Sequence, residues 1–264
     1  CPTRRDVFGT SEAIKFNEII RKNISDLPVE IVDLDGINQE KLLYCDEDIK
    51  TIIEHFKKAE VDGIFFPHCN FGSENRVAQV AKALNVPVLI WGPRDDFPDE
   101  NGLRSRDSQC GMFATGKVLR RYNIPFTYLI NSWVNGDEFK KGIEKFISVV
   151  RVVKAMRNIN ILQISTRPEP FCSVICNENE LIEKFNIHIY PVTLNDLVLQ
   201  MKAVEDEKPA ELNDTINFIK SIDRIGKEDD IKKLASLKIA MKRLAYKYNC
   251  NAIAIQCWSS LQDI

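Results

Sequence analysis

The sequence predicts an α/β protein made of two Rossmann-like, doubly wound parallel-sheet domains, over residues 1–150 and 151–264. Three observations lead to this prediction. Short, unbroken runs of Val, Ile and Phe are typical of strands buried on both faces of a parallel sheet. Between the runs, apolar residues recur at i, i+3, i+4 and i+7, which is the spacing of an amphipathic helix. Runs and helical stretches alternate in units of roughly 30 residues, as βα repeats do.

The strands are expected at seven apolar runs. In chain order these are Val29–Leu34, Val61–Phe66, Val86–Trp91, Ile124–Ile130, Ile159–Ile164, Ile187–Val192 and Ala252–Ile255. Most are followed directly by polar residues, which marks the end of each strand. A second series of βα units starts at Ile159, and we therefore place the domain boundary near residue 150.

The helices are expected at amphipathic stretches between the strands: Asp48–Ala59, Ser73–Leu84, Asp137–Met156 and Asp230–Tyr248. The first has Ile49, Ile52, Ile53 and Phe56 at helical spacing, the second Val77, Val80, Ala81 and Leu84, and the third Ile143, Phe146 and Val150. Ser73 is a suitable N-cap for the second helix. The charged stretch from Glu205 to Pro209 is expected to be a loop.

Composition limits the possible functions. Of the 264 residues, 44% are hydrophobic and 28% charged, the balance of a soluble globular protein. The net charge of −2 gives no indication of a nucleic acid or an anionic membrane as partner. No apolar run reaches the roughly 18–20 residues of a membrane-spanning helix. No glycine-rich dinucleotide or phosphate-binding motif is present.

The eight cysteines are scattered and form no CxxC pair. In a chain of this length, that pattern indicates reduced thiols in a cytoplasmic protein, rather than disulfides or a zinc site. The chain begins without a Met, inside the polar segment Cys1–Asp6, and ends soon after an apolar run. We therefore expect both ends to be cut from a longer protein.

Polar clusters follow five of the expected strands, at the edge where open parallel sheets bind ligands. The clusters are His68–Glu74, Gly92–Asp96, Asn131–Trp133, Ser165–Phe171 and Gln256–Trp258. Amides, hydroxyls, arginines and aromatic rings suit a polyhydroxylated ligand, since each sugar hydroxyl both donates and accepts hydrogen bonds. Loop residues before helices are often polar for capping alone. The repetition along one edge favours a binding site.

Three residues of the first cluster have alternative interpretations. His68 and Cys69 are adjacent on an extended stretch, so their side chains should point to opposite sides, and no acid at a matching spacing completes a metal site. Glu74 lies in the first turn of its helix, where it interacts favourably with the helix dipole whether or not it binds a ligand.

Five motifs, taken in this order, resemble one family: Pro2–Phe8, Trp91–Asp95, Arg106–Phe113, Thr166–Phe171 and Ala252–Trp258. The set is similar to the L-fucose/L-arabinose isomerase family, nearest its fucose-isomerase-like branch. The resemblance implies two Rossmann-like domains followed by a C-terminal catalytic domain. It implies aldose–ketose isomerisation with Mn²⁺ or another divalent cation, which polarises two adjacent sugar oxygens. Carboxylates then move a proton between C1 and C2 through an enediol.

In that family the metal-binding Glu, Asp and His follow the strand matching Ala252–Trp258, and this chain ends at Ile264, before them. The resemblance therefore assigns no catalytic or metal-binding residue here, leaves the second domain incomplete and implies that this chain alone is inactive. It also implies a homo-oligomer, a trimer or hexamer, in which the first domain of one subunit covers the active site of a neighbour.

The resemblance also implies sugar-binding residues. Arg4 or Arg5 matches an arginine near the sugar, and Gln256 matches a glutamine near the sugar and metal. Cys69 stands where the family has an aromatic residue that stacks on the substrate, and an adjoining aromatic is kept as Phe71. The full expected set is Arg4, Arg5, His68, Cys69, Phe71, Glu74, Arg167, Gln256 and Trp258.

The sequence thus predicts a ketol isomerase acting on a pentose, hexose or deoxyhexose, with the metal site beyond this chain. The change at Cys69 argues against fucose itself. Two alternatives remain open. The chain could be a non-catalytic sugar-binding module, similar to periplasmic binding proteins, or a structural domain used in assembly.

Overall fold

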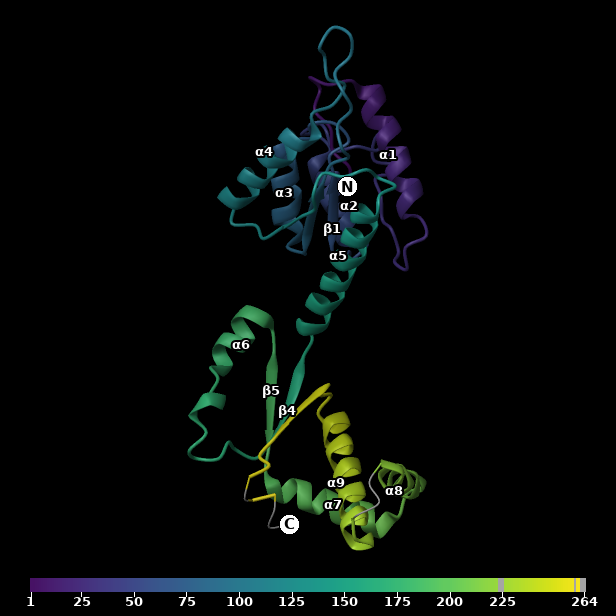
Figure 1. The fold of residues 1–264 in the computed structure, drawn as a ribbon. Coiled ribbons are helices and arrows are strands. Elements are labelled where there is room, and N and C mark those ends of the chain that lie inside the picture. Colours follow the sequence, from purple (N-terminus) through teal and green to yellow (C-terminus); the bar gives the residue numbers. More distant parts are fainter. Residues whose placement is uncertain (223–225, 259, 262–264) are drawn as a thin grey trace. The chain divides into compact units, whose positions relative to one another are not determined.

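The computed structural model describes residues 1–222, 226–258 and 260–261, in two compact units, Cys1–Lys154 and Ala155–Ile264 (Figure 1). Each unit is a mixed α/β structure around a three-stranded sheet in which every pair of strands is parallel. The predicted fold class is confirmed. None of the described helices combines the length and apolar character needed to cross a membrane.

The first unit contains helices α1 (Thr10–Ile24), α2 (Ile49–Lys58), α3 (Glu74–Leu84), α4 (Ser108–Arg121) and α5 (Asp137–Met156) and strands β1 (Ile64–Pro67), β2 (Val88–Trp91) and β3 (Thr127–Tyr128). The strands lie in the order β1-β2-β3, with Ile64 opposite Val88 and Leu89 opposite Thr127. The helix predicted over Asp137–Met156 has these bounds, and the one predicted over Ser73–Leu84 begins one residue later, with Ser73 as its N-cap.

Two short extended segments continue this sheet beyond β1. Thr3 forms parallel bridges with both His68 and Leu43. The Thr3 amide donates to the Pro67 carbonyl at 2.9 Å, and the Leu43 amide donates to the Pro2 carbonyl at 2.8 Å. Across the sheet the order is therefore the Leu43 segment, the Thr3 segment, β1, β2 and β3. Numbered by their position along the chain, these five segments read 2-1-3-4-5, which is a doubly wound arrangement. The strand order reverses between the segment at Thr3 and β1.

Helices cover both faces of this sheet. On one face, Phe66 and Ile90 pack with residues of α2, α3 and α4. On the other face, Leu89 and Trp91 pack with residues of α1 and α5. Neighbouring side chains of β2 thus pack into the cores on opposite faces of the sheet, because side chains alternate along a strand. The continuous apolar runs of β1 and β2 reflect burial on both sides.

The strand predicted at Val29–Leu34 is wrong, because this segment is not paired into a ladder. Val29 and Ile31 are 39% and 41% exposed, so the run is only half buried. The strand position beside β1 is taken instead by the polar residues around Thr3. The strand predicted at Ile124–Ile130 shortens to β3, which has only β2 as a neighbour and is exposed at the sheet edge.

The second unit contains β4 (Asn160–Ile164), a 3₁₀ turn (Cys172–Val174), α6 (Glu178–Phe185), β5 (His188–Val192), α7 (Leu194–Glu207), α8 (Ala210–Ile222), α9 (Glu228–Lys247) and β6 (Ala252–Ile255). Its strands lie in the order β5-β4-β6. Leu162 and Ile164 of the central strand are fully buried against residues of α7 and α9. The predicted loop from Glu205 to Pro209 is shorter, because α7 continues to Glu207.

Candidate functional site

Two loops of the first unit meet where the strand order reverses, which is where doubly wound sheets bind ligands. One loop follows Thr3, and the other follows β1. The backbone amide of Arg5 donates to Asn70 Oδ1 at 2.8 Å, and Asn70 Nδ2 donates back to the Arg5 carbonyl at 3.2 Å. This pair of hydrogen bonds fixes the first loop to the second.

The Arg5 side chain is oriented by three residues of the β1 loop and the start of α3. Its Nε donates to the Gly72 carbonyl at 3.0 Å, and its Nη2 pairs with Glu74 Oε1 at 2.5 Å. The guanidinium carbon lies 4.4 Å from the centre of the Phe71 ring, which stacks on Phe8 with centroids 5.7 Å apart. Within the described residues, Nη1 has no hydrogen-bond partner, and the side chain is 35% exposed. Arg5 is therefore held firmly but can still donate outward.

A shallow cavity of about 280 Å³ lies at this point, close to the lower end of ligand-pocket sizes. Its lining consists of Arg5, Asp46, Ser73, Glu74, Asn75 and Arg76. Arg76 Nε pairs with Asp46 at 2.8 Å, and the Ser73 hydroxyl donates to the Arg4 carbonyl at 2.6 Å instead of capping α3. Carboxylates, guanidinium groups and the N-terminus of α3 together offer both acceptors and donors, as a polyhydroxylated ligand requires.

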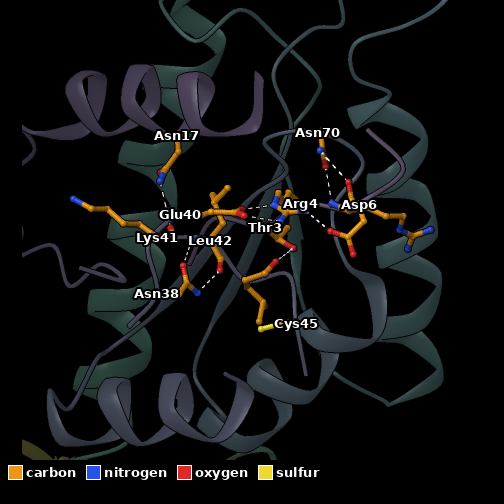
Figure 2. Close-up of polar contacts among 12 residues, drawn as sticks. Thr3, Arg4, Asp6, Asn17, Asn38, Glu40, Lys41, Leu42, Cys45 and Asn70 are labelled. Atoms are coloured by element: carbon orange, nitrogen blue, oxygen red, sulfur yellow. Dashed lines mark hydrogen bonds and ion pairs between the residues drawn. The ribbon is translucent and has the colours of Figure 1, made fainter. Parts of the chain in front are cut away.

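Arg4 and Arg5 differ sharply in their surroundings. The Arg4 side chain is 5% exposed and forms ion pairs with both Asp6 and Glu40 (Figure 2). A second bond joins its Nη2 to Glu40 at 2.8 Å, and its guanidinium carbon lies 4.0 Å from the centre of the Tyr44 ring. Its donors are used within the protein, so Arg4 stabilises the loop, and Arg5 is the arginine that lines the cavity.

The segment that carries Glu40 is itself fixed by amide side chains (Figure 2). Asn38 Nδ2 donates to the Leu42 carbonyl at 2.9 Å and to Asp48 at 2.7 Å. Asn17 of α1 donates to the Lys41 carbonyl at 3.3 Å. These contacts hold in place the residues that lead into the Leu43 segment, which continues to Asp46 in the cavity lining.

His68 and Cys69 are both fully buried, and neither lines the cavity. His68 Nδ1 lies 3.2 Å from the Phe66 carbonyl and Nε2 lies 2.9 Å from the Thr115 hydroxyl. Burial lowers the pKa of His68 to about 4, so its ring is neutral at pH 7. Cys69 belongs to the core on the other face of the sheet, and burial raises the pKa of its thiol to about 12. The expected opposite directions of these two side chains are confirmed.

The expected site residues of the second unit gather at the ends of β4 and β6. The Ser165 hydroxyl donates to Gln256 Oε1 at 2.8 Å, and Gln256 Nε2 donates to the Trp258 carbonyl at 3.3 Å. The Trp258 ring contacts Phe171 with centroids 5.2 Å apart. Arg167 turns onto its own loop, with Nη1 2.6 Å from the Glu169 carbonyl. These residues form a polar cluster at the strand ends of the second unit.

Sequence reasoning missed four residues of the cavity: Asp46, Ser73, Asn75 and Arg76. Asp46 follows the extended segment at Leu43, whose short apolar run Leu42–Cys45 was not predicted as a strand. Ser73 was expected as a cap and as a member of the polar cluster His68–Glu74 but not as a named binding residue, and the other two lie on the first turn of α3. Asn70, which ties the two loops together, is an amide at a strand end, and that position was the available signal.

The described residues contain no group of three or more His, Cys, Asp or Glu side chains that could hold a metal ion. The residues described therefore do not fit a divalent cation. A larger cavity, of about 550 Å³, lies between α1 and α5 and includes Ile20, Phe146 and Val150 in its lining. It contains none of the expected site residues.

Comparison with known proteins identifies relatives of this chain. The family model described as fucose/sulfoquinovose isomerase, N-terminal domain, matches residues 1–157. The sulfoquinovose isomerase of Priestia aryabhattai is 22% identical over 225 residues, covering 84% of this chain and 49% of the relative. That of Alkalicoccus urumqiensis is 24% identical over 221 residues, covering 83% and 48%. The chain spans about half the length of the curated relatives it matches.

Proposed function

This chain belongs to the fucose/sulfoquinovose isomerase family, and from this premise we propose that its parent protein interconverts an aldose and the corresponding ketose. The observation that carries the proposal is the position of Arg5, fixed by Asn70, Phe71 and Glu74 at the reversal of strand order. The substrate is a pentose, hexose or deoxyhexose, and the relatives named for sulfoquinovose add a sulfonated hexose to the candidates.

Arg5 contributes to this function by binding and orienting the sugar. Its Nη1 donates to a sugar oxygen, while Glu74 and Asp46 accept from hydroxyls at the same cavity. The Phe71 ring contacts Phe8 and the Arg5 guanidinium, so it orients Arg5 in place of stacking on the substrate. Orientation of this kind lowers the barrier by removing motional freedom before the reaction.

The proton transfer itself needs groups that this chain does not supply among its described residues. We propose that Mn²⁺ or another divalent cation is held elsewhere in the parent protein, where it would polarise two adjacent sugar oxygens. We propose further that residues 1–264 alone convert no sugar and, from the family resemblance, that the parent works as a trimer or hexamer.

The test uses the full-length parent protein with MnCl₂ and a panel of pentoses, hexoses, deoxyhexoses and sulfoquinovose, with ketose formation followed by NMR. We expect conversion of at least one sugar. We expect Arg5→Ala to raise KM by about 10- to 100-fold, since a hydrogen bond from a charged donor contributes about 1.5–3 kcal/mol. No conversion of any sugar would refute the isomerase, and an unchanged KM in Arg5→Ala would refute the role of Arg5.

Arg21 offers a matched control for that variant. Its side chain is also 35% exposed, and it pairs with Asp33 at 2.5 Å, as Arg5 does with Glu74. It lies outside the cavity at the strand ends. Arg21→Ala should therefore leave KM unchanged, and an equal rise in KM would show that the loss of any paired surface arginine has this effect.

The second candidate is a sugar-binding module without catalysis. Each unit has a polar cluster where its parallel strands end, and this arrangement fits binding alone as well as it fits catalysis. Calorimetric titration of the parent with the same sugars, without added metal, separates the two. Micromolar binding without any conversion favours the module, and conversion excludes it.

A further inference from the structure

The loop that orients Arg5 rests directly on helix α4. At Gly111, an added Cβ would lie 1.7 Å from the Phe71 carbonyl oxygen and 2.6 Å from the carbonyl carbon. Both contacts are to backbone atoms, which cannot rotate away as a side-chain end can. Any residue larger than glycine at this position must therefore displace the loop, by about 1.7 Å if the contact is to reach an ordinary separation of about 3.4 Å.

One turn further along α4, Thr115 supports the same loop through His68. The Phe66 carbonyl can only accept a hydrogen bond, so His68 Nδ1 carries the proton and Nε2 accepts from the Thr115 hydroxyl at 2.9 Å. The His68 ring in turn lies under Gly72, whose φ is +80° and where a Cβ would lie 2.4 Å from the ring. The loop is thus enclosed between α4 and a neutral imidazole.

The residues of this loop are the ones that hold Arg5. Asn70 bonds to the Arg5 backbone, Phe71 contacts the guanidinium and the Gly72 carbonyl accepts from Nε. A shift of the loop therefore moves the guanidinium relative to the cavity. The helix is well packed at this point, since Gly111 and Thr115 are both buried.

We propose that Gly111 and Thr115 are positioning residues, which act through the loop at Phe71 to set the place of the Arg5 guanidinium. This rests on the proposed function, because it assumes that Arg5 binds the sugar. A displacement of about 1 Å at a positioned group can cost on the order of 100-fold in rate. Gly111→Ala should accordingly weaken substrate binding about as much as Arg5→Ala does.

The kinetic experiment compares four variants of the full-length parent: Gly111→Ala, Thr115→Val, Thr115→Ser and Gly116→Ala. Gly116 is the matched control, since it lies on the same helix and the nearest atoms to an added Cβ would be side-chain atoms, of Phe126 at 3.2 Å and of Ile90 at 3.8 Å. We expect Gly111→Ala to raise KM at least tenfold, Thr115→Val to raise it less, and Thr115→Ser to restore it. Gly116→Ala should keep the KM of the unmodified protein.

A purely structural role would give a different result, because loss of folded protein lowers the apparent kcat and leaves KM unchanged. An unchanged KM in Gly111→Ala, or the same rise in Gly116→Ala, overturns the positioning role. If Arg5→Ala raises KM and Gly111→Ala does not, only this inference fails. If Arg5→Ala has no effect, the proposed function of Arg5 fails first.

A second readout does not depend on activity. The Arg5 amide is bonded to Asn70 Oδ1, so its hydrogen exchange reports whether the loop stays in place. We expect faster exchange at Arg5 in Gly111→Ala and an unchanged rate in Gly116→Ala. Equal protection in both variants would overturn the inference even if the parent converted none of the sugars tested.

Discussion

Acid should weaken the fold of the first unit through His68. In the folded protein, burial lowers the pKa of this ring from an ordinary 6.5 to about 4. Between these two values the unfolded chain binds a proton that the folded chain does not. The contribution of the neutral His68 ring to the unfolding free energy is therefore present in full above about pH 6.5 and is lost as the pH falls toward 4. The loss from this one group amounts to about 0.8 kcal/mol at pH 6, about 2 kcal/mol at pH 5 and about 3 kcal/mol at pH 4.

The assay is urea unfolding of the chain at pH 8, 6, 5 and 4, for the unmodified protein and for His68→Gln. Trp91 is buried in the first unit, and a Trp258→Phe background removes the tryptophan signal of the second unit. His188→Gln, in the second unit, controls for the loss of one histidine. Other titrating groups are common to all variants and cancel in the difference.

We expect the unfolding free energy of the unmodified chain to fall by about 2 kcal/mol more than that of His68→Gln between pH 8 and pH 5. His68→Gln will be less stable at pH 8, because it disturbs the contact with Thr115, but its pH dependence should be shallower. Parallel pH profiles for the two proteins would refute the neutral, buried state of His68. A steeper profile in the variant would refute it as well.

Two further predictions concern residues beside the cavity. Arg4→Met leaves the half-buried Glu40 without its ion-pair partner, and it should lower the free energy of unfolding by about 2 kcal/mol. Urea unfolding measures this change. A decrease below about 0.5 kcal/mol would contradict the structural role of Arg4. Cys69 should resist iodoacetamide at pH 8, because burial raises the pKa of its thiol to about 12, whereas the exposed Cys110 should react. Peptide mass spectrometry of protein labelled with and without urea measures both reactions. Equal labelling of the two cysteines in the folded protein would contradict the prediction.

The helices and the strands buried on both faces were predictable because their apolar spacing is imposed by packing. The bounds of α5 follow directly from the pattern, and β2 lies inside the run Val86–Trp91. The half-buried run Val29–Leu34 shows where this reasoning fails. Hydrophobicity indicates burial, whereas a strand also needs a neighbouring backbone to pair with, and pairing leaves no mark in a single sequence.

The most consequential error concerns the segment around Thr3. Its neighbours Pro2 and Arg4 give no apolar alternation, so the sequence does not announce a strand there. It nevertheless lies inside the sheet, between the Leu43 segment and β1, and is bridged to both Leu43 and His68. Without it, the reversal of strand order beside β1 cannot be located, and the loops that meet there look like independent polar stretches.

The site residues could be predicted by type but not by role. An arginine or an amide at a strand end indicates a binding site, but Arg4 and Arg5 are equivalent by that criterion. The structure separates them by hydrogen-bonding capacity: the donors of Arg4 are used by Asp6 and Glu40, while Nη1 of Arg5 has no partner among the described residues. The exposed fractions of the two side chains differ in the same sense, 5% for Arg4 and 35% for Arg5.

The same criterion applied to the second unit gives a different outcome. Gln256 uses both ends of its amide within its own loops, on Ser165 and on the Trp258 carbonyl, and Arg167 donates to its own backbone. A ligand that binds these side chains must therefore exchange existing hydrogen bonds for new ones, which reduces the net gain. At Arg5 no such exchange is needed, because the guanidinium is already fixed, its Nη1 has no partner among the described residues and the residue lines the cavity. Sheet order decides which loops meet, and unused hydrogen-bonding capacity decides which residue within them can bind a sugar.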